Sequence, residues 1–162
     1  MLTKSVRRLA VLAAVGASML GMTIAAPAAS AAVVPAATLM SQIVTQTNQQ
    51  RAKAHCGQLK VNQKLVTASV RHSSYMASTG NFSHTGSRGS TFVSRTRAVG
   101  YTGAVGENIG WGYRTSTDMM KAWMASPGHR ANILNCSAKS IGVGVVYARN
   151  GTPYYTQEFG RI

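Results

Sequence analysis

The chain has 162 residues, 45% of them hydrophobic, and carries 17 Lys and Arg against three Asp and Glu, for a formal net charge of +14. The basic residues never form a run of five or six, which argues against an arginine-rich arm for nucleic acid, so we expect no nucleic-acid partner. The excess of positive charge favours anionic partners, such as cell-wall polymers.

Residues 1–32 have the three parts of a secretory signal peptide. A basic head is followed by an apolar run over 9–26 and by a small-residue cleavage site at 29–31. The alternative is an uncleaved transmembrane anchor, because the apolar run is near the length of about 18 residues that a span needs. Cleavage near residue 32 removes three basic residues and leaves 130 residues with a net charge of +11 and no transmembrane span. We therefore expect a secreted, extracellular protein with one domain.

A short apolar tether, residues 33–37, leads into a domain that we place at 38–162. The spacing of apolar residues predicts a helix over 38–54 and a second helix over 62–79. His72 lies on the apolar stripe of the second helix, so we interpret it as a packed core histidine with a hydrogen-bonded ring.

The remaining elements alternate between helix and strand. A loop rich in Gly and Ser over 81–90 is followed by a short helix over 91–99 and a strand bounded by glycines over 105–113. A further helix over 115–125 and a hairpin over 141–160 complete the domain. Asn150-Gly151 in the hairpin favours a type I′ turn. Helices that precede and interrupt a few strands indicate an α+β fold, with helices packed on a small, mainly antiparallel sheet.

Cys56 and Cys136 are the only cysteines, 80 positions apart. In an exported chain a lone pair is most simply a disulfide. The alternative is that one of them is a catalytic nucleophile.

Three acidic residues are available for chemistry. Asp118 lies in the first turn of a predicted helix, where the helix dipole alone explains an acid. Glu158 lies in the last strand, where we expect it to face solvent. Glu107 is flanked by Gly106 and Asn108 at the start of a strand, as a site residue would be, because glycine permits a close approach of other groups.

Two histidines are better site candidates than His72. His84 lies among small residues, where an imidazole has room to face a cleft. If Ser126 is an N-cap, Pro127 is N1 and His129 is N3, where the positive end of the helix dipole favours a neutral imidazole. Alternatively, His129 merely occupies a tolerant position in the first turn. His84, Glu107 and His129 would suit a divalent metal such as zinc, or an acid/base pair with an orienting carboxylate.

Five segments occur in the order found in the bacterial branch of the CAP superfamily, which the chain resembles from about Leu39 to Phe159. They are Asn48–Arg51, Phe82–Gly86, Gly106–Ile109, Ser126–Leu134 and Tyr154–Gly160. The superfamily includes cysteine-rich secretory, antigen 5 and pathogenesis-related proteins, and bacterial members contain an SCP-like domain.

The resemblance implies an α-β-α sandwich whose central cleft commonly holds two histidines and two acidic residues, with a bound divalent ion in some members. His84, Glu107 and His129 match three of these four positions. The second acidic residue often stands three places after the helical tryptophan, and here that place is Ser126.

The resemblance leaves function open between two classes. Our first expectation is a secreted monomeric binding module, not an enzyme, whose cleft engages a small ligand, a divalent metal or an anionic wall polymer, and which needs no cofactor. The alternative is an extracellular hydrolase that acts on peptides or wall material through His84, Glu107 and His129. The same histidines on a basic surface are compatible with a secreted ribonuclease, but the helical pattern and the CAP motifs argue against it.

Overall fold

The structure, a computed structural model, describes residues 33–162. The expected signal peptide, and its alternative as an anchor, lie outside the described residues. Within 33–162 no helix is both long enough and apolar enough to cross a membrane.

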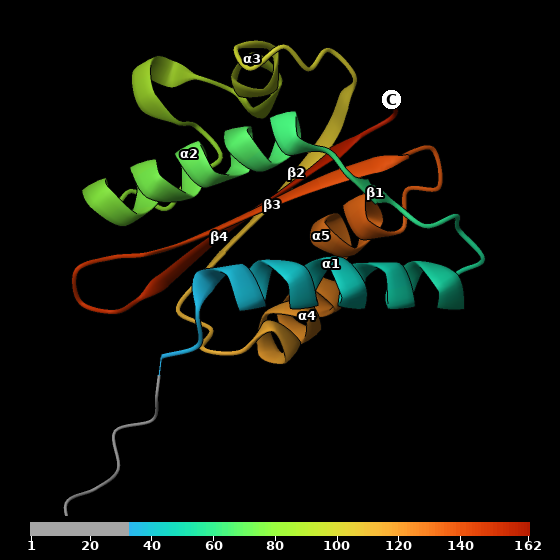
Figure 1. Ribbon diagram of the computed structural model, residues 1–162, viewed down its shortest axis with the longest axis horizontal. Coiled ribbons are helices and arrows are strands. Elements are labelled where there is room, and N and C mark those ends of the chain that lie inside the picture. Colours follow the sequence, from blue (N-terminus) through green and yellow to red (C-terminus); the bar gives the residue numbers. More distant parts are fainter. Residues whose placement is uncertain (1–32) are drawn as a thin grey trace, which may run out of the picture. The chain divides into compact units, whose positions relative to one another are not determined.

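Five α-helices and a four-stranded sheet form three layers (Figure 1). The elements in chain order are α1 (Ala36–Lys53), β1 (Lys60–Val61), α2 (Gln63–Thr79), a 3-10 turn (Ser87–Gly89), α3 (Phe92–Arg97), β2 (Ala104–Trp111), α4 (Ser116–Ala125), α5 (Pro127–Ile133), β3 (Ser140–Tyr147) and β4 (Pro153–Gly160). Helices α2 and α3 cover one face of the sheet, and α1, α4 and α5 cover the other. The α+β class and the α-β-α sandwich are confirmed.

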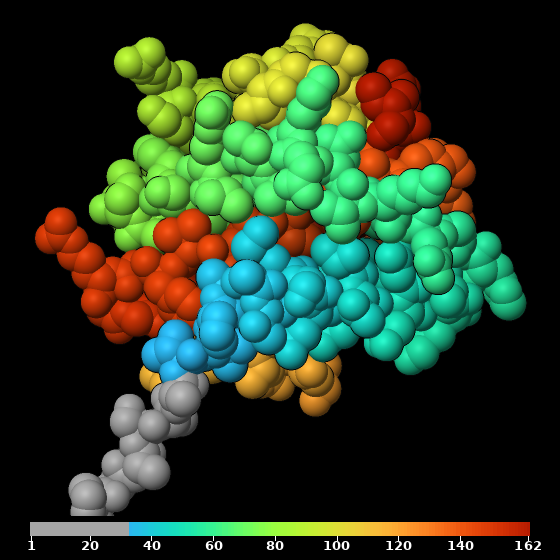
Figure 2. Space-filling model, viewed as in Figure 1, coloured from blue at the N-terminus to red at the C-terminus, as the bar shows by residue number. Residues whose placement is uncertain are grey.

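The strand order is β1-β3-β4-β2, so β2 is an edge strand. β4 pairs antiparallel with both β3 and β2, whereas the two-residue β1, which the sequence did not predict, pairs parallel with β3. In Figure 2 the side chains of α1 and α2 leave little of the sheet visible between them.

The hairpin between β3 and β4 is present, but its predicted type I′ turn is wrong. Gly151 alone in the turn has a positive φ, of 79°, and Ala148 N–H bonds to Thr152 O at 2.9 Å. The connection is therefore a three-residue loop with a left-handed glycine, not a two-residue turn with two left-handed residues.

Helix α2 approaches the sheet closely because β3 presents glycines to it. A Cβ atom on Gly142 would lie 2.2 Å from the Leu65 carbonyl carbon, and one on Gly144 would lie 2.3 Å from the Val70 nitrogen. The Ser69 and Ser73 hydroxyls donate to the carbonyls of these two glycines at 3.1 and 3.0 Å. The central strands are thus buried on both faces.

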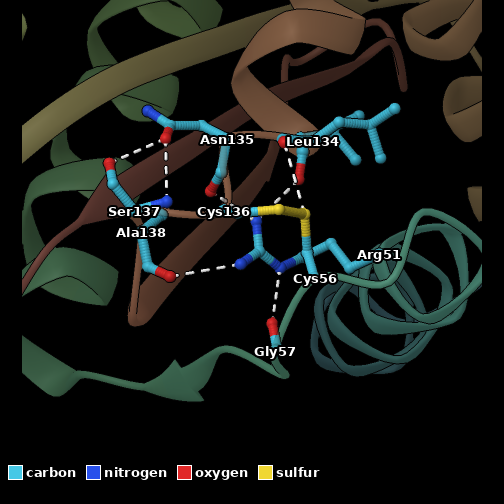
Figure 3. The surroundings of a disulfide bond; sticks show 9 residues. Arg51, Cys56, Gly57, Leu134, Asn135, Cys136, Ser137 and Ala138 are labelled. Atoms are coloured by element: carbon cyan, nitrogen blue, oxygen red, sulfur yellow. Dashed lines mark hydrogen bonds between the residues drawn. A yellow bond between two sulfur atoms is a disulfide. The ribbon is translucent and has the colours of Figure 1, made fainter.

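The predicted disulfide between Cys56 and Cys136 is confirmed. Beside it lies the fully buried guanidinium of Arg51, which donates to four carbonyl oxygens (Figure 3). These belong to Gly57, Ile133, Asn135 and Ala138, at 2.9, 2.9, 2.8 and 3.1 Å. The end of α1 is therefore tied to the segment that follows α5.

Candidate functional site

Glu107 lies on β2 and is the centre of a buried ionisable cluster. It is 5% exposed, and its Oε1 accepts a hydrogen bond from His84 Nδ1 at 2.8 Å. Its Oε2 accepts from the Arg95 guanidinium and lies 3.9 Å from His72 Nε2. Because a carboxylate can only accept, the Nδ1 of His84 bears the proton, and its Nε2 is the ring atom left for a ligand.

The loop before α3 wraps around Arg95. The Arg95 guanidinium donates to the carbonyls of His84 and Ser90, at 3.1 and 2.8 Å. A Cβ on Gly86 would lie 2.6 Å from Ser90 Oγ and 3.0 Å from the Arg95 guanidinium, so a larger residue here would displace these side chains. A capping box between Thr91 and Ser94 starts the helix that presents Arg95. Arg95 thus holds both the loop of His84 and the carboxylate that orients it.

The expectation that Glu158 faces solvent is wrong. Glu158 is 0% exposed and lies directly opposite Glu107 across the β2–β4 pair, so the two side chains share one face of the sheet. Burial, followed by the nearby charge of Glu107, raises the pKa of Glu158 well above its usual range. Burial alone would also raise the pKa of Glu107, but its contacts with His84 and Arg95 outweigh burial and lower that pKa. The two shifts have opposite directions, so the site favours the carboxylate form of Glu107 and the neutral acid form of Glu158.

His72 occupies the place that we expected for it. It is 1% exposed, and its Nε2 donates to Ser83 O at 3.0 Å. Burial is the main cause that lowers its pKa, so the ring is neutral at neutral pH. It also supports the cluster, because it lies against Glu107.

His129 lies on the opposite side of the sheet edge from this cluster, on α5. The Asn108 amide donates to its carbonyl at 3.1 Å and to Gln157 Oε1 at 3.0 Å, and Gln157 in turn donates to Thr47 Oγ1 at 2.8 Å. Burial, and then the charge of nearby His84, lower the pKa of His129. Both effects favour the neutral imidazole that the sequence predicted.

Ser126 occupies the N-cap position of α5, as predicted, but its side chain makes no capping hydrogen bond. Ser126 lines a cleft that also includes His129. The cleft has a volume of about 520 Å³ and is mostly aromatic and apolar; the other lining residues are Phe82, Ile109, Gly110, Trp111, Gly112, Tyr113, Met119, Ala122 and Trp123.

The predicted site residues come together only in part. His84 and Glu107 are in contact, and His129 lies near enough to His84 to respond to its charge. Residues 33–162 contain no group of three His, Cys, Asp or Glu side chains placed to hold one metal ion. Sequence reasoning missed Arg95, which no motif marked, and the role of Glu158 beside Glu107.

Similarities to known proteins agree with this architecture. The model of the cysteine-rich secretory protein family (CAP) matches residues 44–159. YkwD of Bacillus subtilis, described as uncharacterized, is 36% identical over 120 residues, which are 73% of this chain and 45% of YkwD. The chain thus spans less than half the length of this relative.

Two solved structures are also similar. An extracellular protein with an SCP domain from Bacillus anthracis shares 28% identity with a TM-score of 0.70, over 82% of this chain and 45% of that one. A cysteine-rich secretory protein of Staphylococcus aureus shares the fold, at 22% identity and a TM-score of 0.64, over 81% of this chain and 40% of that one. Since the family model covers well over half of the sequence, the chain belongs to the cysteine-rich secretory protein (CAP) family.

Proposed function

We propose that this protein is an exported binding module that associates with anionic cell-wall material and binds a small ligand in the aromatic cleft beside His129. The observation that supports binding over hydrolysis is the state of the acidic side chains. Glu107 uses both oxygens to accept from His84 and Arg95, and Glu158 is buried behind it. Asp118 accepts from the Thr115 hydroxyl at 2.7 Å, at the start of α4.

The distribution of charge supports association with an anionic polymer. Asp118 is the one exposed acidic side chain of residues 33–162, whereas twelve basic side chains are exposed. They are Lys53, Lys60, Lys64, Arg71, Arg88, Arg97, Arg114, Lys121, Arg130, Lys139, Arg149 and Arg161. Such a surface attracts polyanions at long range, and the attraction weakens with salt. The similar Bacillus anthracis protein is described as extracellular, which agrees with export.

A divalent metal such as zinc stays a second proposal for the same site. Glu107 does not fit as a direct ligand, because Arg95 and His84 occupy its oxygens. The remaining donors are His84 Nε2 and the His129 ring, with Glu107 orienting His84 through Nδ1, as carboxylates often orient metal-binding histidines. Two imidazoles are fewer than the three protein ligands of an ordinary catalytic zinc site. Calorimetric titration with zinc tests this proposal, and sub-micromolar binding lost in His129→Ala would establish the site.

Binding to purified cell-wall material at several salt concentrations tests the main proposal. We expect a component that disappears with rising salt, from the basic surface, and a salt-resistant component that His84→Ala and His129→Ala remove. Val61→Ala is the matched control, since Val61 is an exposed apolar residue on β1, away from the cleft. If both histidine variants bind as the wild type does at every salt concentration, the cleft does not contribute. Turnover of a peptide or glycan substrate that is lost in Glu107→Gln would instead favour the hydrolase.

A further inference from the structure

The floor of the cleft is the open edge of the sheet. Gly112 N–H bonds to Pro153 O on β4 at 2.9 Å. In an antiparallel pair every second residue directs both its N–H and its C=O toward the partner strand. Gly110 and Asn108 therefore also face β4, and Glu107, Ile109 and Trp111 direct their backbone groups away from it.

Two side-chain contacts confirm this direction. The Trp123 indole donates to Ile109 O at 2.9 Å, and the Asn132 amide donates to Glu107 O at 3.1 Å. Side chains of α4 and α5 thus occupy the outward carbonyls of Ile109 and Glu107 on β2. At Trp111 neither the N–H nor the C=O has a side-chain or loop partner among the described residues, and the N–H of Ile109 likewise has none.

Aromatic side chains stand beside these free backbone groups. Phe82, Trp111 and Tyr113 line the cleft, although they are 42%, 52% and 39% exposed. The rings of Phe82 and Trp111 lie 6.2 Å apart. On the other side of the edge are Ser126 and His129, so a ligand lying along β2 would meet apolar surface, free backbone groups and two polar side chains.

We infer that the cleft binds the C-terminal residues of an extended peptide, which adds to the edge of β2 at Trp111. This inference rests on the proposed binding function and names the class of ligand. One peptide residue would exchange two hydrogen bonds with the backbone of Trp111, as in other strand additions. The covered carbonyl of Ile109 stops further pairing, so only a chain end fits.

Charge selects the direction of the peptide. In the antiparallel direction its C-terminus points from Trp111 toward Ile109, where the free groups are the Ile109 N–H, the Ser126 hydroxyl and the neutral His129 ring. A carboxylate is complementary to these donors and to the predominantly basic exposed surface of residues 33–162. The parallel direction would place a peptide ammonium there, against N–H donors and among positive charges.

The test uses the peptide acetyl-Ala-Tyr-Ala-Ala with a free carboxylate and the same peptide with a C-terminal amide. We expect the acid to quench the fluorescence of the exposed Trp111 and to shift the amide resonances of Ile109 and Trp111. The amide should bind about tenfold or more weakly, a loss of about 1.4 kcal/mol. Equal binding of the two peptides, or binding of neither at millimolar concentration, would overturn the inference.

Substitution of Trp111 separates its backbone from its ring. Trp111→Ala keeps the free N–H and Trp111→Pro removes it, and an edge strand tolerates proline where the N–H faces outward. Calorimetry should show the peptide acid binding more weakly to Trp111→Pro than to Trp111→Ala, with Val61→Ala as control and circular dichroism to verify folding. If the two Trp111 variants bind alike, the edge is not used.

Should Trp111→Pro fail to fold, N-methylation of each peptide residue in turn replaces this variant. Binding by every methylated peptide would refute strand addition. Salt-resistant wall binding that depends on His129, in a protein that binds neither peptide, would retain the proposed function and remove only this inference.

Discussion

The disulfide between Cys56 and Cys136 should supply a large part of the stability of this domain. It closes a loop with a sequence separation of 80 residues. By the loop-entropy relation a cross-link of this span destabilises the unfolded chain by about 4.5 kcal/mol. Because a domain of this size has an unfolding entropy of about 0.27 kcal/mol per kelvin, removing the bridge should lower Tm by roughly 15 °C.

Thermal unfolding followed by circular dichroism, on the wild type and on Cys56→Ala/Cys136→Ala, measures this difference. The wild type in strong reductant and a Cys56→Ser/Cys136→Ser variant are the controls, and both should melt close to the alanine variant. If Tm falls by less than about 5 °C, the reasoning is refuted, because the unfolded chain then gains little freedom when the bridge is removed.

The same variant also separates stability from the site. The segment after α5 remains tied to α1 without the bridge, through the hydrogen bonds of Arg51 to Ile133 O and Asn135 O. Well below its Tm, the double variant should therefore keep the ligand affinity of the wild type.

Three further predictions concern buried groups. Arg51→Met should lower the unfolding free energy by about 3 kcal/mol or more in urea titrations, because it leaves buried carbonyls without donors, and Arg51→Lys should restore little of this loss. Gly144→Ala should cost about 3 kcal/mol or prevent folding, since its Cβ would lie 2.3 Å from the backbone of α2. Alanine at Gly128 in α5, where a Cβ meets nothing within 4 Å, should instead leave stability unchanged or raise it by up to about 1 kcal/mol. The pKa of Glu158 is higher in the folded state than in the unfolded state. Its contribution to the free energy of unfolding is therefore fully present below its pKa in the unfolded state and is lost as the pH rises toward its pKa in the folded state. Glu158→Gln should therefore gain stability over the wild type between pH 4 and pH 7 in urea titrations, and a difference that stays constant over that range would contradict the burial of a neutral acid.

The helices, the hairpin and the disulfide could be predicted because each has a local signal. Apolar periodicity marks α1 and α2, and two cysteines in an exported chain leave one pairing. The two-residue β1 has no such signal, since its parallel pairing with β3 depends on a contact between residues 80 positions apart, Lys60 and Ser140. The turn type was wrong because Asn150-Gly151 fits both a two-residue and a three-residue loop, and only the register of β3 on β4 decides between them.

The site shows a sharper limit of sequence reasoning. Glu158 was expected in solvent because it is a charged residue in the last strand of the chain, and one face of a small antiparallel sheet is often exposed to water. β4 lies between β3 and β2 with helices on both faces, and all eight of its residues are buried, so its polar residues face the protein interior instead of water. Gln157 has Asn108 and Thr47 as hydrogen-bond partners, whereas Glu158 lies opposite Glu107 and neither of its oxygens has a hydrogen-bond partner among the described residues.

Gln157 and Glu158, two buried polar residues of β4 beside β2, act on different histidines. The network of Gln157 and Asn108 holds the backbone of His129, and the pair of Glu158 and Glu107 lies behind His84. Each histidine is thus positioned by a polar residue of β2, one on each face of the sheet. Because Asn108 and Glu107 are consecutive, their side chains necessarily point to opposite faces of the sheet, so Asn108 contacts His129 on one face and Glu107 contacts His84 on the other. The sequence Glu107-Asn108 therefore links the two halves of the site through the alternation of a single strand, and the backbone groups without partners lie further along the same edge, at Trp111.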